Sequence, residues 1–239
     1  MKPFETITLI FPAYNEAARI VNTVNEAVMY FEHRNLDYEI IVAADGEDGT
    51  RDLVDYMRQT NSRLKAIGKA ERRGKGYGIR QAVAMANGDV IGFADADNKT
   101  PITEFEKFLP YLSNGAQVVI GSRAQRGSVI EQPQPLYRRL GSKGFGIFMH
   151  LVVGLRDIPD TQCGFKFFRR QVAKDLFARQ KIDGYMFDVE ILYLARRAGY
   201  CLEQVPVLWR DDGDSRLNLL AGNIHNVRDI FKIRFTQYD

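Results

Sequence analysis

The stretch GDVIGFADAD, residues 88–97, joins a short apolar run to two carboxylates. The apolar residues at 90–93 favour a buried strand, and the glycine before them breaks the preceding segment, so the pattern predicts a strand that ends at Asp95. In an open α/β sheet, ligands bind at the carboxyl ends of the strands. If the strand continued to Asp97, both carboxylates would face one point and could share a cation such as Mg²⁺ or Mn²⁺. The alternative is a solvated acidic turn.

Segments typical of strands and of helices alternate on both sides of this stretch. The strand candidates are 6–14, 38–45, 63–69, 89–97 and 116–123, and the helix candidates are 17–33, 50–59, 75–88, 137–154 and 187–200, with a last strand candidate at 201–209. The alternation predicts βαβ units and an α/β fold, in which a Rossmann-like, mostly parallel sheet carries helices on both faces. Because the strands end in polar or small residues, we expect their carboxyl ends to line one site.

The composition is that of an ordinary globular protein. The 239 residues, 45% of them hydrophobic, fit one large domain or one domain with an appendage. No run of ~20 apolar residues is present and the first residues lack the regions of a signal peptide, which predicts a cytoplasmic protein. A net charge of +3 does not indicate a nucleic-acid partner. Cys163 and Cys201 indicate reduced core thiols rather than a disulfide framework or a zinc site.

Two segments stand apart from the alternating pattern. Residues 124–135, AQRGSVIEQPQP, have the Gly, Pro and Gln content of a loop, and a long loop beside a site is typical of a lid. Residues 216–239 carry apolar residues at helical spacing among four basic ones, Arg216, Arg228, Lys232 and Arg234. That pattern is typical of a basic amphipathic helix on an anionic membrane surface. The alternative is a helix that packs on its own domain.

Five short motifs occur in a characteristic order: PAYNE at 12–16, ADGEDGT at 44–50, RRGKG at 72–76, DAD at 95–97 and GSR at 121–123. Together they resemble the nucleotide-sugar-dependent glycosyltransferases of family 2, which have the GT-A fold. The resemblance runs over essentially the whole chain. It implies a catalytic domain over residues 1–215 and a C-terminal helix over residues 216–239.

Three motifs of the second half narrow the resemblance: DTQCGFKFFRR at 160–170, FDVEILYLARRAGY at 187–200 and VPVLWRDDGDSRLN at 205–218. They are similar to the polyprenyl-phosphate (dolichyl-phosphate) glucosyl and mannosyl transferases, and the QCGFK form is most similar to the dolichyl-phosphate β-glucosyltransferases. The resemblance implies UDP-glucose ahead of GDP-mannose as the donor and a polyprenyl phosphate as the acceptor. It also implies a peripheral position at the cytoplasmic face of a membrane.

The resemblance implies a nucleotide diphosphate sugar bound at the sheet edge. Asp97 would hold Mg²⁺ or Mn²⁺, which offsets the charge that builds up on the leaving diphosphate. Asp95 would contact the ribose or share the metal. The remaining residues of the donor site would be Pro12, Ala13, Tyr14 and Glu16 around the base and ribose, Asp45 at the base, and Ala96 between the two aspartates. For Pro12 and Ala13 the alternative is an ordinary turn.

Two lysines bear on the donor site. Lys75 lies at a predicted helix start, where a cation and free backbone donors attract a diphosphate, and the alternative is a solvated basic turn. Lys99 departs from the mannosyl relatives, which often place a polar metal ligand there, because a protonated lysine cannot coordinate a cation. The chain would then bind metal through fewer protein ligands or through Asn98.

A lipid phosphate is already a nucleophile near pH 7, so it needs cations that position it rather than a general base. By the resemblance, Arg123 and Arg210 occupy phosphate-contact positions, and so do Arg138 and Ser142, which share a helical face. For Arg210 the alternative is an ion pair with Asp211 or Asp212.

A sugar hydroxyl acceptor would instead require a carboxylate base. Asp188 occupies the position where family 2 enzymes that act on hydroxyls usually carry that base, and Asp160 is a second candidate that otherwise orders its loop. Either acceptor gives a single in-line displacement, so an α-linked donor yields a β-linked product. The alternatives are therefore a family 2 enzyme of polysaccharide or glycolipid synthesis and a noncatalytic nucleotide-binding module. A Rossmann dehydrogenase is disfavoured because no GxGxxG follows the first strand.

Overall fold

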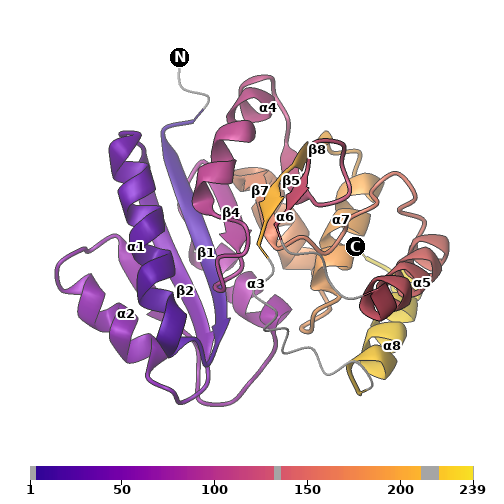
Figure 1. Ribbon diagram of the computed structural model, residues 1–239, viewed down its shortest axis with the longest axis horizontal. Helices are drawn as coiled ribbons and strands as arrows, with labels where there is room; N and C mark the ends of the chain where they lie inside the picture. The colour runs from indigo at the N-terminus through magenta and orange to yellow at the C-terminus, as the bar shows by residue number, and fades with distance from the viewer. Residues whose placement is uncertain (1–3, 132–135, 211–220, 239) are drawn as a thin grey trace.

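A seven-stranded sheet forms the centre of the computed structural model, which describes residues 4–131, 136–210 and 221–238 (Figure 1). Its strands are β1 (Thr6–Tyr14), β2 (Asp37–Asp45), β3 (Leu64–Ile67), β4 (Val90–Ala94), β5 (Val118–Ser122), β7 (Phe165–Arg169) and β8 (Leu202–Pro206). They lie in the order β3-β2-β1-β4-β7-β5-β8. Only β7 runs against its neighbours β4 and β5, and the other pairs are parallel. The predicted mostly parallel α/β sheet is confirmed.

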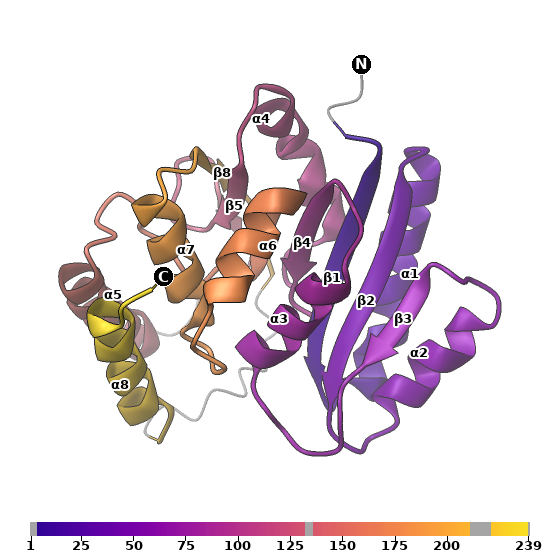
Figure 2. The same ribbon diagram turned by 180° about the vertical axis from the view of Figure 1, so that it is seen from behind.

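Helices cover both faces of the sheet, as Figures 1 and 2 show from opposite sides. One face carries α1 (Ala17–His33), α2 (Thr50–Arg58), the 3₁₀ helix η1 (Ile102–Lys107) and α4 (Leu109–Ser113). The other face carries α3 (Lys75–Met85), α6 (Arg170–Arg179) and α7 (Phe187–Arg197), with α5 (Leu136–Val153) and α8 (Ala221–Phe235) packed together beside α7.

Alternate side chains of each central strand enter two separate cores. In β1, Ile10 joins the core under α3 and α7, whereas Leu9 and Phe11 join the core under α1. All three side chains are 0–2% exposed. Complete burial of such a side chain contributes roughly 1.5–3 kcal/mol, so the period-two pattern fixes which way each strand faces.

The antiparallel strand β7 fits beside β4 because β4 contains a glycine. A Cβ atom at Gly92 would lie 2.1 Å from the ring of Phe167. That ring packs against Phe105 and Phe108 at centroid distances of 4.5 and 5.5 Å. Gly92 therefore lets an aromatic cluster anchor β7, which carries residues of the site described below.

Two predictions need correction. Residues 124–135 are not only a loop, because Val129–Ile130 forms β6, which pairs in parallel with β9 (Leu208–Trp209); residues 132–135 lie outside the described residues. The expectation of two core thiols holds for Cys163 alone, whose pKa burial raises to about 12, while Cys201 is exposed. In the parts of the chain that the structure describes, no helix has both the length and the apolar character needed to span a membrane.

Candidate active site

Asp95 and Asp97 lie in a turn beyond β4, at the carboxyl edge of the sheet. The prediction that the strand reaches Asp95 is wrong, since β4 ends at Ala94. The Asn98 amide donates to the Asp95 carbonyl at 3.2 Å, and Asn98 adopts a left-handed φ of 56°. The Asp95 amide donates to the Gly164 carbonyl at 3.0 Å, which ties the turn to the segment before β7. A turn, rather than strand alternation, brings the two carboxylates together.

The Asp97 carboxylate is largely shielded from water. Burial, together with the nearby Asp95 carboxylate, raises the pKa of Asp97 above its usual value, and Lys99 acts in the opposite direction. The Lys99 ammonium lies 3.6 Å from Asp97 and 5.7 Å from the centre of the Trp209 ring. The Lys99 ammonium thus places a positive charge beside Asp97. Residue 99 therefore supplies no further oxygen ligand for a metal ion.

Lys75 is the first residue of α3, so the predicted helix start is confirmed. Its ammonium lies 2.6 Å from Asp95 and 4.0 Å from Asp188. Burial alone would lower the pKa of Lys75, but the carboxylates of Asp95 and Asp188 raise it above its usual value. The side chain is 17% exposed, which contradicts the alternative of a solvated basic turn.

Asp188 and Lys166 form a buried ion pair behind Lys75. The Lys166 ammonium, 0% exposed, lies 2.6 Å from Asp188 Oδ1 and also donates to the Cys163 carbonyl. Burial raises the pKa of Asp188 above its usual value, against the opposing effect of Lys166 and Lys75. Lys166, Asp188, Lys75 and Asp95 therefore form an alternating row of charges, called here the charge chain, which leads from the core to the sheet edge.

Arg123 and the buried Asp160 form a second ion pair at this edge. The guanidinium donates to both Asp160 oxygens at 2.8 and 2.7 Å, and the Arg123 amide donates to the same carboxylate at 2.7 Å. Although burial opposes it, Arg123 lowers the pKa of Asp160 below its usual value. The guanidinium carbon lies 5.4 Å from the centre of the Trp209 ring. Asp160 thus holds both the backbone and the side chain of Arg123 in place.

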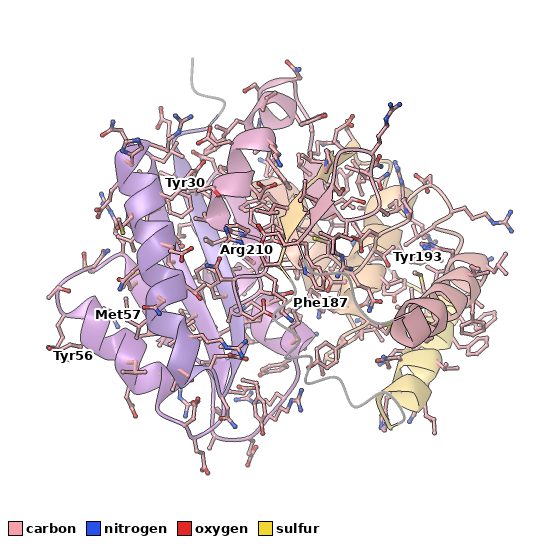
Figure 3. The ribbon with its side chains drawn as sticks, in the orientation of Figure 1. Tyr30, Tyr56, Met57, Phe187, Tyr193 and Arg210 are labelled. Atoms are coloured by element: carbon pink, nitrogen blue, oxygen red, sulfur yellow. The ribbon has the colours of Figure 1, made fainter. Side chains whose placement is uncertain are left out.

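The remaining predicted acceptor residues come from two segments. Arg210 directly follows β9 and is labelled in Figure 3; its amide donates to the Lys99 carbonyl at 2.8 Å, and its side chain lies 3.5 Å from Glu131. The alternative partners Asp211 and Asp212 lie outside the described residues. Arg138 and Ser142 are both part of α5, as predicted, and the structure describes their backbone only.

Residues predicted to contact the nucleotide base lie at the ends of β1 and β2. Tyr14 is the last residue of β1, and the Arg72 guanidinium lies 4.4 Å from its ring centre and donates to the Tyr185 hydroxyl at 2.9 Å. Asp45, the last residue of β2, accepts from the amides of Lys69 at 3.2 Å and Arg73 at 2.8 Å. Asp45 therefore also shapes the loop before α3.

The other predicted donor-site residues, Pro12, Ala13, Glu16 and Ala96, make backbone contacts within the fold. Pro12 and Ala13 lie within β1, where they pair with β2, so the alternative of an ordinary turn is wrong. Glu16 precedes α1, and its amide donates to the Thr50 hydroxyl at 3.0 Å. Ala96 is buried, and its carbonyl accepts from the Thr23 hydroxyl at 2.9 Å. The Ala96 contact ties the DAD turn to α1.

The site also contains Lys166, Trp209 and Gly164, which the sequence patterns did not indicate. Lys166 could have been found from the sequence FKFFRR, where one lysine stands among aromatic residues of a buried strand. A lysine is almost never fully buried without a partner, so this pattern indicates a buried ion pair. Gly164 has a steric role, since a Cβ atom there would lie 2.1 Å from Asp95 Oδ2.

We expect Gly164→Ala to displace the Asp95 carboxylate and to break its contact with Lys75. Because 2.1 Å is far inside van der Waals contact, the expected result is a loss of Mn²⁺ and nucleotide affinity of about tenfold or more, of the size of one charge-assisted hydrogen bond. Isothermal calorimetry measures it. Gly144→Ala is the control, because a Cβ atom there meets no atom within 4 Å. Unchanged affinity in Gly164→Ala would show that Asp95 does not belong to the donor site.

The carboxylates fit a divalent cation of the Mg²⁺ type. Among the described residues there is no group of three or more His, Cys, Asp or Glu placed to hold a metal. Mg²⁺ usually keeps several waters and binds through one or two carboxylates plus substrate phosphates, and Asp95 with Asp97 supply that number. A divalent cation would also offset the repulsion between the two carboxylates, which is visible in the raised pKa of Asp97 beside Asp95.

The chain is similar to known proteins in sequence. The sequence model described as Glycosyl transferase family 2 matches residues 8–177. A dolichyl-phosphate beta-glucosyltransferase of Trichomonas vaginalis is 33% identical over 251 residues, which cover 97% of this chain and 74% of that protein.

Two solved structures share the fold at lower identity. Mannosyl-3-phosphoglycerate synthase from Rubrobacter xylanophilus matches with a TM-score of 0.69 at 17% identity, over 95% of this chain and 72% of the other. Glucosyl-3-phosphoglycerate synthase from Mycobacterium tuberculosis, in complex with Mn²⁺, UDP and phosphoglyceric acid, matches with a TM-score of 0.66 at 18% identity, over 96% and 77% of the two chains. The likeness confirms the predicted GT-A fold.

Proposed function

Because the chain belongs to glycosyl transferase family 2, we propose that this glycosyltransferase moves glucose from UDP-glucose to a polyprenyl phosphate such as dolichyl phosphate. The sequence relative named above is a dolichyl-phosphate beta-glucosyltransferase, which supports the acceptor and the sugar. A fold relative bound to Mn²⁺ and UDP supports a uridine nucleotide and a divalent cation. GDP-mannose is the second candidate donor.

The charge chain is the observation that carries the proposal. Lys75, its outermost lysine, lies at the start of a helix and beside the DAD turn, where a diphosphate gains from a nearby cation. Asp97 and Asp95 would hold Mg²⁺ or Mn²⁺, which supplies charge stabilisation to the departing diphosphate when bound. Lys75 remains protonated through the reaction, because its carboxylate partners raise its pKa.

The displacement needs no proton transfer. A phosphate oxygen of the acceptor forms the bond to the anomeric carbon, the bond from that carbon to the diphosphate breaks, and its electron pair leaves with the nucleotide. Arg123, held by Asp160, and Arg210 at the end of β9 would position the acceptor phosphate, together with Arg138 and Ser142 of α5.

The surroundings of Asp188 favour this acceptor over a sugar hydroxyl. A general base must come within about 2.6–3.2 Å of the hydroxyl whose proton it takes. The Asp188 side chain is 4% exposed, its Oδ1 is bound to Lys166 at 2.6 Å, and Lys75 lies on the side of its Oδ2. We propose that Asp188 fixes the two lysines instead of acting as a base.

Donor profiling with the purified chain tests the proposed function. We expect Mn²⁺-dependent glucosyl transfer from UDP-glucose to a short polyprenyl phosphate, and little transfer from GDP-mannose. Calorimetry should show UDP binding in the presence of Mn²⁺. Tight GDP binding without UDP binding would reverse the donor assignment, and transfer to sugar hydroxyls but not to polyprenyl phosphate would favour the glycoside-forming alternative.

We further propose that residues 1–215 are the catalytic domain and that the C-terminal helix within 216–239 faces a membrane. The exposed apolar side chains of α5 and α8 form what we call the membrane patch: Ile147, Leu151, Ile224, Phe231 and Phe235. The two helices contact each other, with the Phe148 and Phe231 rings 5.9 Å apart, so their exposed apolar side chains lie on neighbouring helices. Exposed Arg228, Lys232 and Arg234 lie on the same helix α8.

Other apolar side chains of α5 and α8 belong to the core. Met149 and Val153 of α5 are 3% and 4% exposed, and Ile230 and Ile233 of α8 are 0% exposed. These residues hold α5 and α8 on the domain. Arg216, Leu217 and Leu220 lie outside the described residues.

We expect the chain to bind anionic vesicles at low salt and to lose binding as salt rises, because surface charges are screened within ~10 Å at 0.1 M. Cosedimentation with vesicles of varied anionic content measures it. Phe231→Ser with Phe235→Ser should weaken binding, whereas Tyr56→Ser should not, since Tyr56 is 72% exposed on α2, at the other end of the molecule (Figure 3). Equal binding by all variants would place the contact elsewhere.

A further inference from the structure

Glu190 is a fully buried carboxylate that the proposed reaction does not use. It lies on α7, two residues after Asp188, and is 0% exposed. Its oxygens accept from the amides of Lys181 at 2.8 Å and Ile182 at 2.9 Å and from the Tyr238 hydroxyl at 2.8 Å. Three donors on one buried carboxylate make it the fixed point of the segment before α7, called here the 180–184 loop.

The 180–184 loop covers the first turn of α3. The Tyr77 amide donates to the Asp183 carbonyl at 3.1 Å, and Arg80 lies 2.6 Å from the Asp183 carboxylate. The fit is close, because a Cβ atom at Gly74 would lie 2.3 Å from the Asp183 carbonyl oxygen and one at Gly76 would lie 2.7 Å from that of Ile182. Displacement of the loop would therefore move the turn that carries Lys75.

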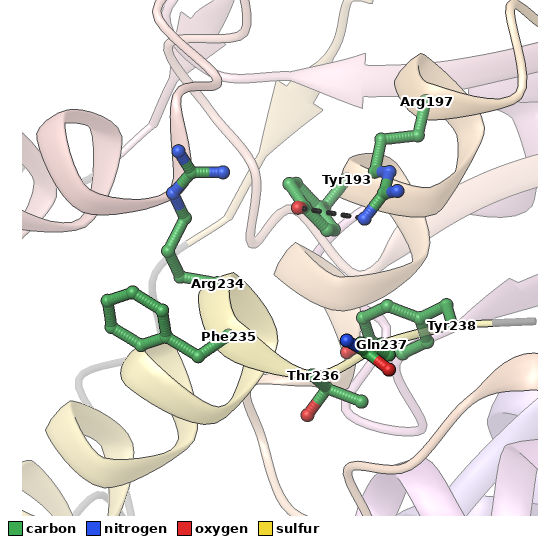
Figure 4. Close-up of a pocket in the computed structure, with 7 residues that line it drawn as sticks. All are labelled: Tyr193, Arg197, Arg234, Phe235, Thr236, Gln237 and Tyr238. Carbon is green, nitrogen blue, oxygen red and sulfur yellow. Dashed lines mark hydrogen bonds between the residues drawn. The ribbon is translucent and has the colours of Figure 1, made fainter.

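The C-terminal end of the chain completes this arrangement. Tyr238 follows α8 and lies beside Tyr193, at a ring distance of 6.2 Å, in a pocket of about 780 Å³ (Figure 4). On the same helix α8, the Lys232 ammonium lies 3.2 Å from the Lys181 carbonyl and donates to it. Two contacts from the C-terminal segment thus reach the 180–184 loop and its anchor.

We propose that Glu190 and Tyr238 are positioning residues of the donor site. They hold the 180–184 loop on the first turn of α3 and so place the Lys75 ammonium at Asp95, where it meets the diphosphate. The inference rests on the proposed function in one respect, the contact between Lys75 and the donor. It makes the C-terminal segment part of the donor site as well as a membrane-facing element.

The test compares two deletions of a single hydroxyl. Tyr238→Phe removes the contact with Glu190, and Tyr193→Phe removes a hydroxyl from the same pocket that accepts from Arg197 at 3.3 Å. In Tyr238→Phe we expect faster hydrogen exchange at the amides of Lys181, Ile182 and Tyr77. The KM for the donor should rise about threefold to tenfold at nearly constant kcat, as for the loss of one hydrogen bond. Tyr193→Phe should leave both unchanged.

The outcomes separate this inference from the proposed function. If Tyr238 served stability alone, Tyr238→Phe would have a lower melting temperature, but its donor KM would be unchanged at temperatures well below melting. That result overturns the proposal. Unchanged exchange at Tyr77 in both Tyr238→Phe and Glu190→Gln overturns it as well. Should the wild-type chain bind neither UDP nor GDP, the proposed function fails, while exchange at Tyr77 still decides whether the loop holds α3.

Discussion

Asp97→Ala is expected to lower turnover by about 10²–10³-fold, the cost of removing a group that stabilises charge in a transition state. The leaving diphosphate gains negative charge as the sugar departs, and Asp97 is the shielded carboxylate that would hold the offsetting cation. Lys75 and Lys99 remain in the variant, but the single positive charge of each would not replace the divalent cation that Asp97 would hold.

Initial rates at saturating UDP-glucose and Mn²⁺ measure this effect. Asp37→Asn is the control, because Asp37 starts β2 at the opposite edge of the sheet and forms an exposed pair with Arg63 at 3.2 Å. A ligand carboxylate must be deprotonated, and the pKa of Asp97 is raised. As the pH falls, Mn²⁺ affinity should therefore begin to weaken at a higher pH than for an ordinary aspartate. Full turnover in excess chelator would refute the metal-assisted mechanism.

Lys166→Met is expected to lower the free energy of unfolding by about 3–5 kcal/mol, the usual cost of removing one partner of a buried ion pair. Lys166 is 0% exposed and lies 2.6 Å from Asp188, so its loss leaves a buried carboxylate with Lys75 4.0 Å away as the nearest described cation. A methionine fills similar space without a charge, which isolates the electrostatic effect from cavity formation.

Urea unfolding followed by circular dichroism measures this loss. Arg34→Met is the matched control, because Arg34 lies 2.7 Å from Glu106 but both side chains are at least 40% exposed, and such pairs contribute about 0–1 kcal/mol. The double variant Lys166→Met with Asp188→Asn should recover part of the loss. A difference below about 1 kcal/mol between Lys166→Met and the control would mean that water reaches the pair.

Local patterns predicted most of the fold. The strand expected at 6–14 and the helix expected at 17–33 match β1 and α1 at both ends, because each has a clear hydrophobic period and a polar boundary. The error at β4 is also local: the alternation of Ala and Asp over residues 94–97 is compatible with a continuing strand, whereas the hydrogen bond from Asn98 to the Asp95 carbonyl closes a turn there.

The sequence indicated which residues lie at the site, but it did not indicate which of them contact one another. Asp95, Asp97 and Lys75 do meet at one edge, as the order of strands required. Sequence alone did not indicate that Arg123 is held by Asp160, 37 residues away, or that Lys166 lies behind Asp188. Such pairings depend on which strand lies beside which, and no local period encodes the place of β7 between β4 and β5.

The place of β7 also sets an order in which the protein can assemble during synthesis. Among the described strands, β5 pairs only with β7 and β8, and both follow it in the chain. Strands β1 to β4 can therefore form a sheet as they leave the ribosome, while β5 must wait for residues 165–169. Pairing over such separations is slow, because the loop must close before its contacts form. Lys166 and Gly164 are synthesised together with β7. The charge chain and the contact between Gly164 and Asp95 are therefore completed late. A ribosome-bound chain that ends before β7 would expose the β4 edge to chaperones.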